Sequence, residues 1–152
     1  MGLNAEPNGE LLLSFAQRLA QFPSDANAYS NLVLRLQLVS KLEPCVDLLQ
    51  RFGLYPHVTY LVWKRVVQIA GEEEGALLFA AHAFYAMGED EDARAVLDGV
   101  LERNAESVAA WELMAMISPD VEMKREIFER ILKIEPGNRS AVDNLIMLGR
   151  PR

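Results

Sequence analysis

Residues 77–104 read LLFAAHAFYAMGEDEDARAVLDGVLERN, and this stretch decides the fold. Leu77 opens an apolar segment of helical length that ends at Gly88, and a second segment begins near Asp90. Glycine ends helices because it readily adopts the left-handed backbone conformation, and carboxylates are favourable at a helix N-terminus. The stretch therefore predicts two helices joined by a tight turn.

The same pattern returns in residues 111–138, WELMAMISPDVEMKREIFERILKIEPGN, where Trp111 takes the place of Leu77 at an offset of 34 residues (111 − 77 = 34). Two further starts, PSDANAYSNL from Pro23 and PGNRSAVDNL from Pro136, share a proline, a polar turn and an Asn-Leu pair after a bulky residue. A regular offset of this size is typical of helical repeat proteins.

Glycines and prolines divide the rest of the chain into pieces of ordinary helix length, and apolar residues inside the pieces recur at helical spacing. No piece alternates as a strand would. Ser118 and Pro119 are predicted as the N-cap and first residue of one helix. The expected helices cover residues 10–22, 27–40, 44–53, 57–70, 73–87, 90–103, 107–117, 119–134 and 139–149.

Composition excludes several classes of function. The net charge of −7 disfavours nucleic acid and anionic membrane surfaces as partners. The single cysteine, Cys45, allows no intramolecular disulfide, which fits a reducing compartment, and we expect a cytoplasmic protein. The two histidines, His57 and His82, lack a set of ligands at metal spacing, and no nucleophile or phosphate-loop motif is present. We expect no catalytic residues, no cofactor and no metal.

The repeated segments resemble the tetratricopeptide repeat family, whose unit is a helical hairpin. The segment from Leu77 matches its pattern at Ala81, Phe84, Gly88, Ala93 and Leu97, and the segment from Trp111 matches at Met114, Ala115, Phe128 and Pro136. The segment from Tyr29 is degenerate: it keeps Leu32 and has Cys45 where a small residue belongs. Residues 57–70 do not fit the pattern, and we expect them to form an apolar spacer helix between two repeat blocks.

The resemblance implies an all-α fold, a right-handed superhelix of antiparallel helical hairpins with about nine helices and a concave binding face. We expect residues 1–8 to be disordered and residues 9–152 to form one domain, with the clearest repeats at 73–105 and 107–138.

In this family, residues one, five and eight positions after the bulky residue line the concave groove. The basic set that grips a partner's C-terminal carboxylate is missing, so the resemblance implies an apolar peptide or amphipathic helix as the ligand of an adaptor or scaffold module. The alternative for these side chains is that they only pack against each other. The expected groove residues are Leu34, Leu78, His82, Tyr85, Glu112, Met116 and Met147.

Two other functions stay open: a small acidic chaperone of the same family for a secreted or assembling protein, and, with no positive sign, an enzyme or small-molecule binder. Apolar residues spread around much of the helix at 139–149, including Val142 and Ile146. This helix could cap the array, continue into a longer protein, receive the partner or pair with a second copy in a homodimer.

Overall fold

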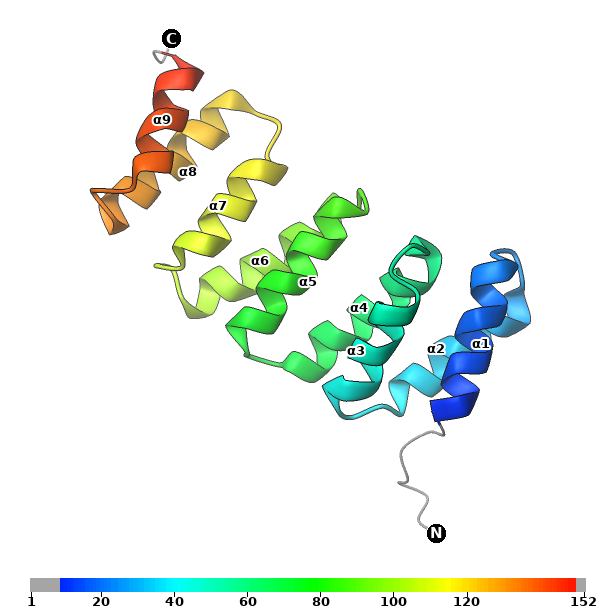
Figure 1. The fold of residues 1–152 in the computed structure, drawn as a ribbon. Helices are drawn as coiled ribbons and strands as arrows, with labels where there is room; N and C mark the ends of the chain where they lie inside the picture. The colour runs from blue at the N-terminus through cyan, green and yellow to red at the C-terminus, as the bar shows by residue number, and fades with distance from the viewer. Residues whose placement is uncertain (1–8, 150–152) are drawn as a thin grey trace. The chain divides into compact units, whose positions relative to one another are not determined.

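The computed structural model describes residues 9–149, and within this range the chain forms nine α-helices and no strand (Figure 1). Every expected helix is present, which confirms the all-α class and the repeat architecture. The predicted disorder of residues 1–8 lies outside the described residues. The helices are α1 (Gly9–Gln21), α2 (Ala26–Gln37), α3 (Leu42–Arg51), α4 (Pro56–Ala70), α5 (Glu74–Ala86), α6 (Asp90–Arg103), α7 (Val108–Ile117), α8 (Val121–Ile134) and α9 (Arg139–Leu148).

Three helix starts share one local arrangement. In each, a polar N-cap side chain accepts a hydrogen bond from the backbone N–H of an alanine three residues later, and that alanine is buried. Such a cap satisfies a backbone donor that has no partner within the helix. The similarity between the two proline-led segments is thus the signature of a capped helix start. The oxygen–nitrogen distances are 3.0 Å for Asp25 with Ala28, 3.3 Å for Ser107 with Ala110 and 2.9 Å for Asn138 with Ala141.

The turn between α5 and α6 is fixed by Gly88, as the sequence predicts. Its φ of 82° lies in the left-handed region. Its N–H donates to the Tyr85 carbonyl at 3.0 Å, and the Glu89 N–H donates to the Phe84 carbonyl at 2.8 Å. These two bonds form a Schellman motif, which ends α5 and allows α6 to begin at Asp90.

The predicted start of α8 is wrong by two residues. Ser118 is not its N-cap: the residue is extended (φ −72°, ψ 121°), and its hydroxyl donates to the Met114 carbonyl at 2.8 Å, at the end of α7. Pro119 disfavours helical conformation in the residue before it, which explains the extended Ser118. The N-cap of α8 is Asp120, whose carboxylate accepts from the Glu122 N–H at 3.1 Å.

The chain divides into two compact units, residues 1–76 and 77–152. In the first unit, α1 packs on α2 and α3 packs on α4, while further contacts join α1 with α3 and with α4, and α2 with α4. The core of this unit takes residues from all four helices, among them Leu19, Leu32, Cys45 and Val62. The expectation of one domain over residues 9–152 stays a prediction.

This packing corrects the expected hairpin that begins at Tyr29. The sequence pattern predicts a hairpin of α2 and α3. In the structure, the most extensive contacts of the unit are those of α1 with α2 and of α3 with α4. Tyr29 is 49% exposed, because the buried stripe of α2 runs through Ala28, Leu32 and Leu36 instead. Helix α4, expected to be a spacer, is part of the core of the first unit through Val58, Leu61, Val62 and Val66.

In the second unit, α6 packs on α7, α7 on α8 and α8 on α9. Ala81 and Ala115, each four residues after the bulky residue of its helix, are fully buried, as the resemblance implies. The Lys124 ammonium of α8 donates to the Ala115 carbonyl at 2.7 Å, which adds a polar contact between α8 and α7.

Helix α9 buries only one residue completely, Ala141. Its C-terminal end is held on α8 by Arg125, a buried side chain whose guanidinium donates to the Gly149 carbonyl at 2.6 Å. Ile146 is 71% exposed, so apolar surface on α9 is uncovered in this chain.

Candidate functional site

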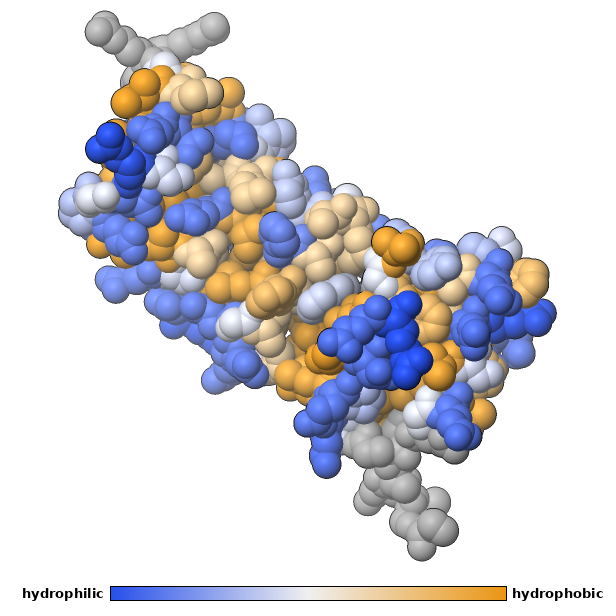
Figure 2. All heavy atoms as spheres, viewed as in Figure 1, coloured by the Kyte–Doolittle hydropathy of each residue, from blue (hydrophilic) through white to orange (hydrophobic). Residues whose placement is uncertain are grey.

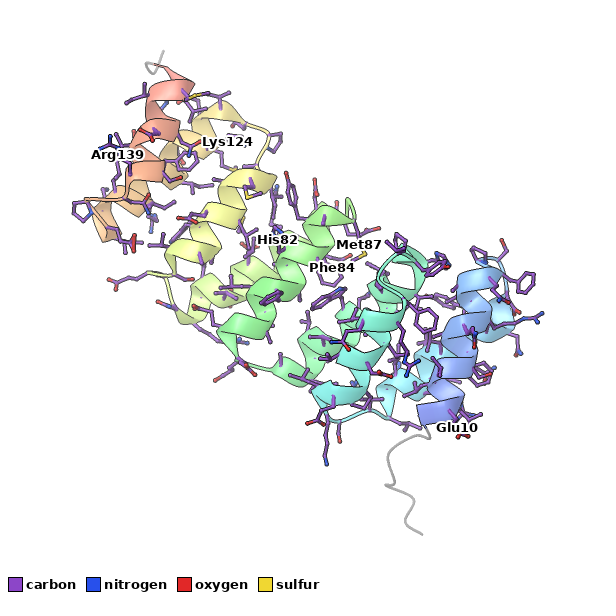
Figure 3. All side chains as sticks on the ribbon, in the orientation of Figure 1. Glu10, His82, Phe84, Met87, Lys124 and Arg139 are labelled. Carbon is purple, nitrogen blue, oxygen red and sulfur yellow. The ribbon has the colours of Figure 1, made fainter. Side chains whose placement is uncertain are left out.

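An apolar pocket lies between α5 and α7 of the second unit, and we call it the α5–α7 pocket. It has a volume of about 400 Å³. Figure 3 shows His82 beside the ribbons of these two helices, and in the space-filling view of Figure 2 apolar residues reach the surface among hydrophilic ones. The lining residues are Leu78, Phe79 and His82 from α5, and Ala109, Glu112, Leu113 and Met116 from α7.

Helical periodicity places these side chains together. On α7, the four lining residues follow one another at intervals of three, one and three positions, which puts them on one face. On α5, Leu78 and His82 are one turn apart. The half-buried Leu78 and Leu113 form the floor, while Phe79, 73% exposed, and Met116, 49% exposed, stand at the rim.

The pocket contains four of the seven predicted groove residues: Leu78, His82, Glu112 and Met116. Tyr85 lies half-buried on α5, one turn beyond His82. The other two are exposed on other helices: Met147 on α9, and Leu34 on α2 of the first unit. The structure therefore places together the candidates from two successive first helices. Whether they bind a partner stays a prediction.

Sequence reasoning missed Phe79, Ala109 and Leu113. Phe79 directly follows a predicted groove residue, and its side chain is the most exposed aromatic ring on α5. A rule that takes fixed positions from each repeat omits such neighbours. The helical spacing from Glu112 and Met116 back to Ala109 and on to Leu113 could have identified the two α7 residues.

The electrostatics of the pocket are simple. Glu112 is the only acidic residue among its lining residues, and its side chain is exposed. Within residues 9–149, its carboxylate accepts no hydrogen bond and forms no ion pair. His82, on the opposite wall, is the only other lining side chain that can ionise.

A second, larger pocket of about 530 Å³ lies among α6, α7 and α8. Its floor includes Trp111, whose indole N–H donates to the Ala105 carbonyl at 2.8 Å, with the Arg130 guanidinium 5.1 Å from its ring centroid. Trp111 is thus only half-buried, not wholly in the core as its repeat position suggests. The rim carries three basic and three acidic residues: Arg94, Arg130, Lys133, Asp98, Glu126 and Glu129.

The first unit has a smaller pocket, of about 230 Å³, between α2 and α4. Its polar wall is occupied internally, because the Arg65 guanidinium donates to the Val39 carbonyl at 2.6 and 3.0 Å and to Gln68 at 2.8 Å. Arg65 and Gln68 of this pocket are therefore already bonded within the unit.

No cluster of three or more metal-ligating side chains is found among the described residues. Cys45 is fully buried, and this burial raises the pKa of its thiol to about 11. A buried neutral thiol is a poor nucleophile. None of the described helices is long and apolar enough to cross a membrane.

A family model described as tetratricopeptide repeat matches residues 63–117, from the second half of α4 to the end of α7. The matched stretch contains both walls of the α5–α7 pocket, and it extends further into α4 than the sequence pattern suggested. No curated protein and no solved structure matches.

Proposed function

The chain carries tetratricopeptide repeats in residues 63–117, and on this premise we propose that it is an adaptor that holds an apolar or amphipathic segment of a partner protein in the α5–α7 pocket. The family consists of protein-interaction modules that are generally not catalytic. The proposal therefore concerns the place and the character of the binding.

One observation carries the proposal: large apolar side chains stand exposed around an apolar floor. Phe79 and Met116 border the floor formed by Leu78 and Leu113. Exposed apolar side chains gathered around a concave surface are typical of interaction sites. Methionine adapts its shape to different apolar partners, and an amphipathic helix binds by laying its apolar face into an apolar groove.

The larger pocket around Trp111 is the weaker candidate. Its rim balances three positive against three negative side chains at one-turn intervals, as on an ordinary solvated helix face. Its aromatic residue already has a hydrogen-bond acceptor and a stacked guanidinium.

The test compares two methionines of similar exposure. Peptides of about 20 residues, long enough to form a helix of about 30 Å, are selected from a random display library against the full chain. Met116→Glu places a charge in the pocket and should lower the affinity for the selected peptides at least tenfold. Fluorescence anisotropy measures this affinity. Met123→Glu is the control, since Met123 is 44% exposed and lies on α8, outside this pocket; because it lines the larger pocket, a loss in this variant alone would favour that pocket.

Circular dichroism must show that both variants keep their helices. Equal binding by Met116→Glu and the wild type would place the site elsewhere, and equal loss in both variants would indicate a nonspecific effect of charge. The chaperone alternative stays a prediction: a chaperone of this kind should co-purify with the product of a neighbouring gene.

A further inference from the structure

We infer that the partner segment carries a lysine or arginine that pairs with Glu112 when the segment fills the α5–α7 pocket. This inference rests on the proposed function and adds the chemistry that would select one apolar segment over another.

The observation behind it is the isolation of one carboxylate. Five of the seven lining residues are apolar, and Glu112 is the only acid among them. The side chain lies on the α7 wall between Ala109 and Met116, on the face that an apolar ligand would cover. In the part of the chain that the structure describes, it has neither a hydrogen-bond donor nor a cation as partner.

Covering this carboxylate without a partner is unfavourable. An apolar ligand seated on Phe79, Leu113 and Met116 removes water from the neighbouring Glu112. A carboxylate that loses water needs hydrogen-bond donors in exchange, and covering it without one is unfavourable. Because residues 9–149 supply no such donor to Glu112, we expect the ligand to bring it.

A basic side chain is the donor that fits best. Lysine and arginine make charge-assisted hydrogen bonds to carboxylates, and their long apolar stems pack well beside residues such as Met116. An acidic or wholly apolar segment would leave Glu112 unpaired or facing a like charge. The pocket would therefore reject segments that match its apolar floor but lack the cation.

The net charge of −7 attracts basic peptides at long range, so a local pair must be distinguished from general attraction. Glu102 provides the control: it is an exposed acid on α6 that does not line the pocket. Glu112→Gln and Glu102→Gln change the net charge equally, and only the first removes the proposed partner of the cation.

The experiment uses the full chain and the peptides selected from the random library. We expect the peptides whose binding is sensitive to Met116→Glu to share a lysine or arginine near their apolar anchors. Glu112→Gln should lower the affinity for these peptides about tenfold, and Glu102→Gln should lower it less than twofold. A charge swap tests the pair directly. In it, the shared basic residue of a peptide is changed to glutamate, and the Glu112→Lys variant should bind this changed peptide better than the original one.

Three outcomes would overturn the inference. Peptides sensitive to Met116→Glu that share no basic residue, or that bind Glu112→Gln as well as the wild type, would refute the pair and leave the proposed function intact. Equal losses in Glu112→Gln and Glu102→Gln would assign the preference to net charge. Peptides insensitive to Met116→Glu would refute the site itself, and with it both proposals.

Discussion

Ala81 and Ala115 occupy equivalent positions in two successive first helices, and both are fully buried. Their complete burial leaves no room for a larger side chain at this position, and for Ala115 the neighbouring helix is α8, which packs on α7. Interiors are close-packed, so added methylene groups at such a crossing displace the helices or force strained rotamers.

The first prediction follows from this position. Ala81→Leu should lower the free energy of unfolding by about 1–3 kcal/mol, since the larger side chain overpacks the crossing. Urea denaturation followed by circular dichroism measures the change. Ala86→Leu, at an exposed position at the end of the same helix, is the control and should change little. Unaltered stability of Ala81→Leu would contradict the assigned register.

At the level of single residues, the sequence predicted the walls of the candidate site unevenly. Leu78, His82, Glu112 and Met116 were found because the repeat fixes which positions of a first helix face outward. Phe79 was missed, because its exposure depends on how far the neighbouring helices extend over it, and periodicity within one helix does not contain that information.

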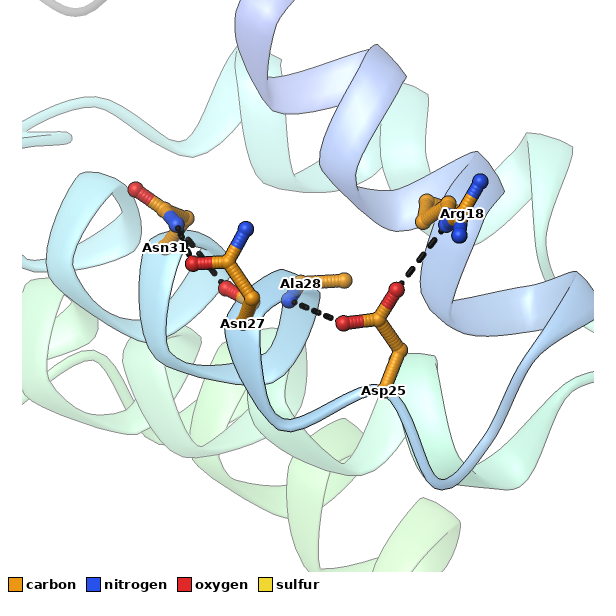
Figure 4. A network of polar contacts seen from close by, with 5 residues as sticks. All are labelled: Arg18, Asp25, Asn27, Ala28 and Asn31. Carbon is orange, nitrogen blue, oxygen red and sulfur yellow. Dashed lines mark hydrogen bonds and ion pairs between the residues drawn. The ribbon is translucent and has the colours of Figure 1, made fainter.

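Among the elements, helix caps show how local chemistry sets the boundaries. Figure 4 shows the cap of α2, where Asp25 accepts from the Ala28 N–H at 3.0 Å and from the Arg18 guanidinium at 2.9 Å. The Ala28 bond, and then the Arg18 bond, hold the pKa of the Asp25 carboxyl below its ordinary value of 3.8. The ionised form of Asp25 is therefore the one that stabilises the fold.

The second prediction concerns the pH dependence of this cap. A lowered pKa means that the stabilisation is present above the ordinary value of 3.8 and is lost as the pH falls through the lowered value. Asp25→Asn keeps a capping oxygen without titrating. Thermal unfolding at a series of pH values should show the wild type losing stability relative to Asp25→Asn below about pH 4. A difference that does not vary with pH would contradict the assignment.

Element boundaries were predictable where glycine or a capping side chain decides them, and less so where two signals compete. Gly88 gave the end of α5 correctly. At Ser118-Pro119-Asp120, both Ser118 and Asp120 are suitable N-caps for α8. The sequence does not show that the Ser118 hydroxyl bonds to the end of α7 and leaves Asp120 to cap α8. The pairing of α3 with α4 was hidden for a different reason: it depends on contacts between helices whose individual patterns are degenerate.

For the molecule as a whole, the feature with the widest consequences is the exposed apolar face of α9. Ile146 lies four residues after Val142, as Ala81 and Ala115 lie after Leu77 and Trp111, yet it is large and exposed where they are small and buried. The small, buried residue found at this position in α5 and α7 is therefore replaced by a large, exposed one in α9. Apolar surface of this kind usually marks an interface.

The third prediction tests whether a second copy covers this face. If α9 pairs two copies of the chain, light scattering should show a dimer for the wild type and a soluble monomer for Ile146→Glu. Leu54→Glu, at an exposed leucine of the first unit, should leave the dimer unchanged. A monodisperse wild-type monomer would rule out self-association through α9. The helix would then be a cap or a surface for another partner.

The packing of helices on near neighbours in the chain has a consequence for how the protein reaches its fold. Each contact pair described within the two units joins helices no more than three places apart in sequence, as α1 is from α4. Short loops cost little entropy to close, and chains rich in local contacts fold fast. Folding can therefore nucleate in more than one place, at the α1–α2 hairpin or at the α7–α8 hairpin, and spread from each to adjacent helices.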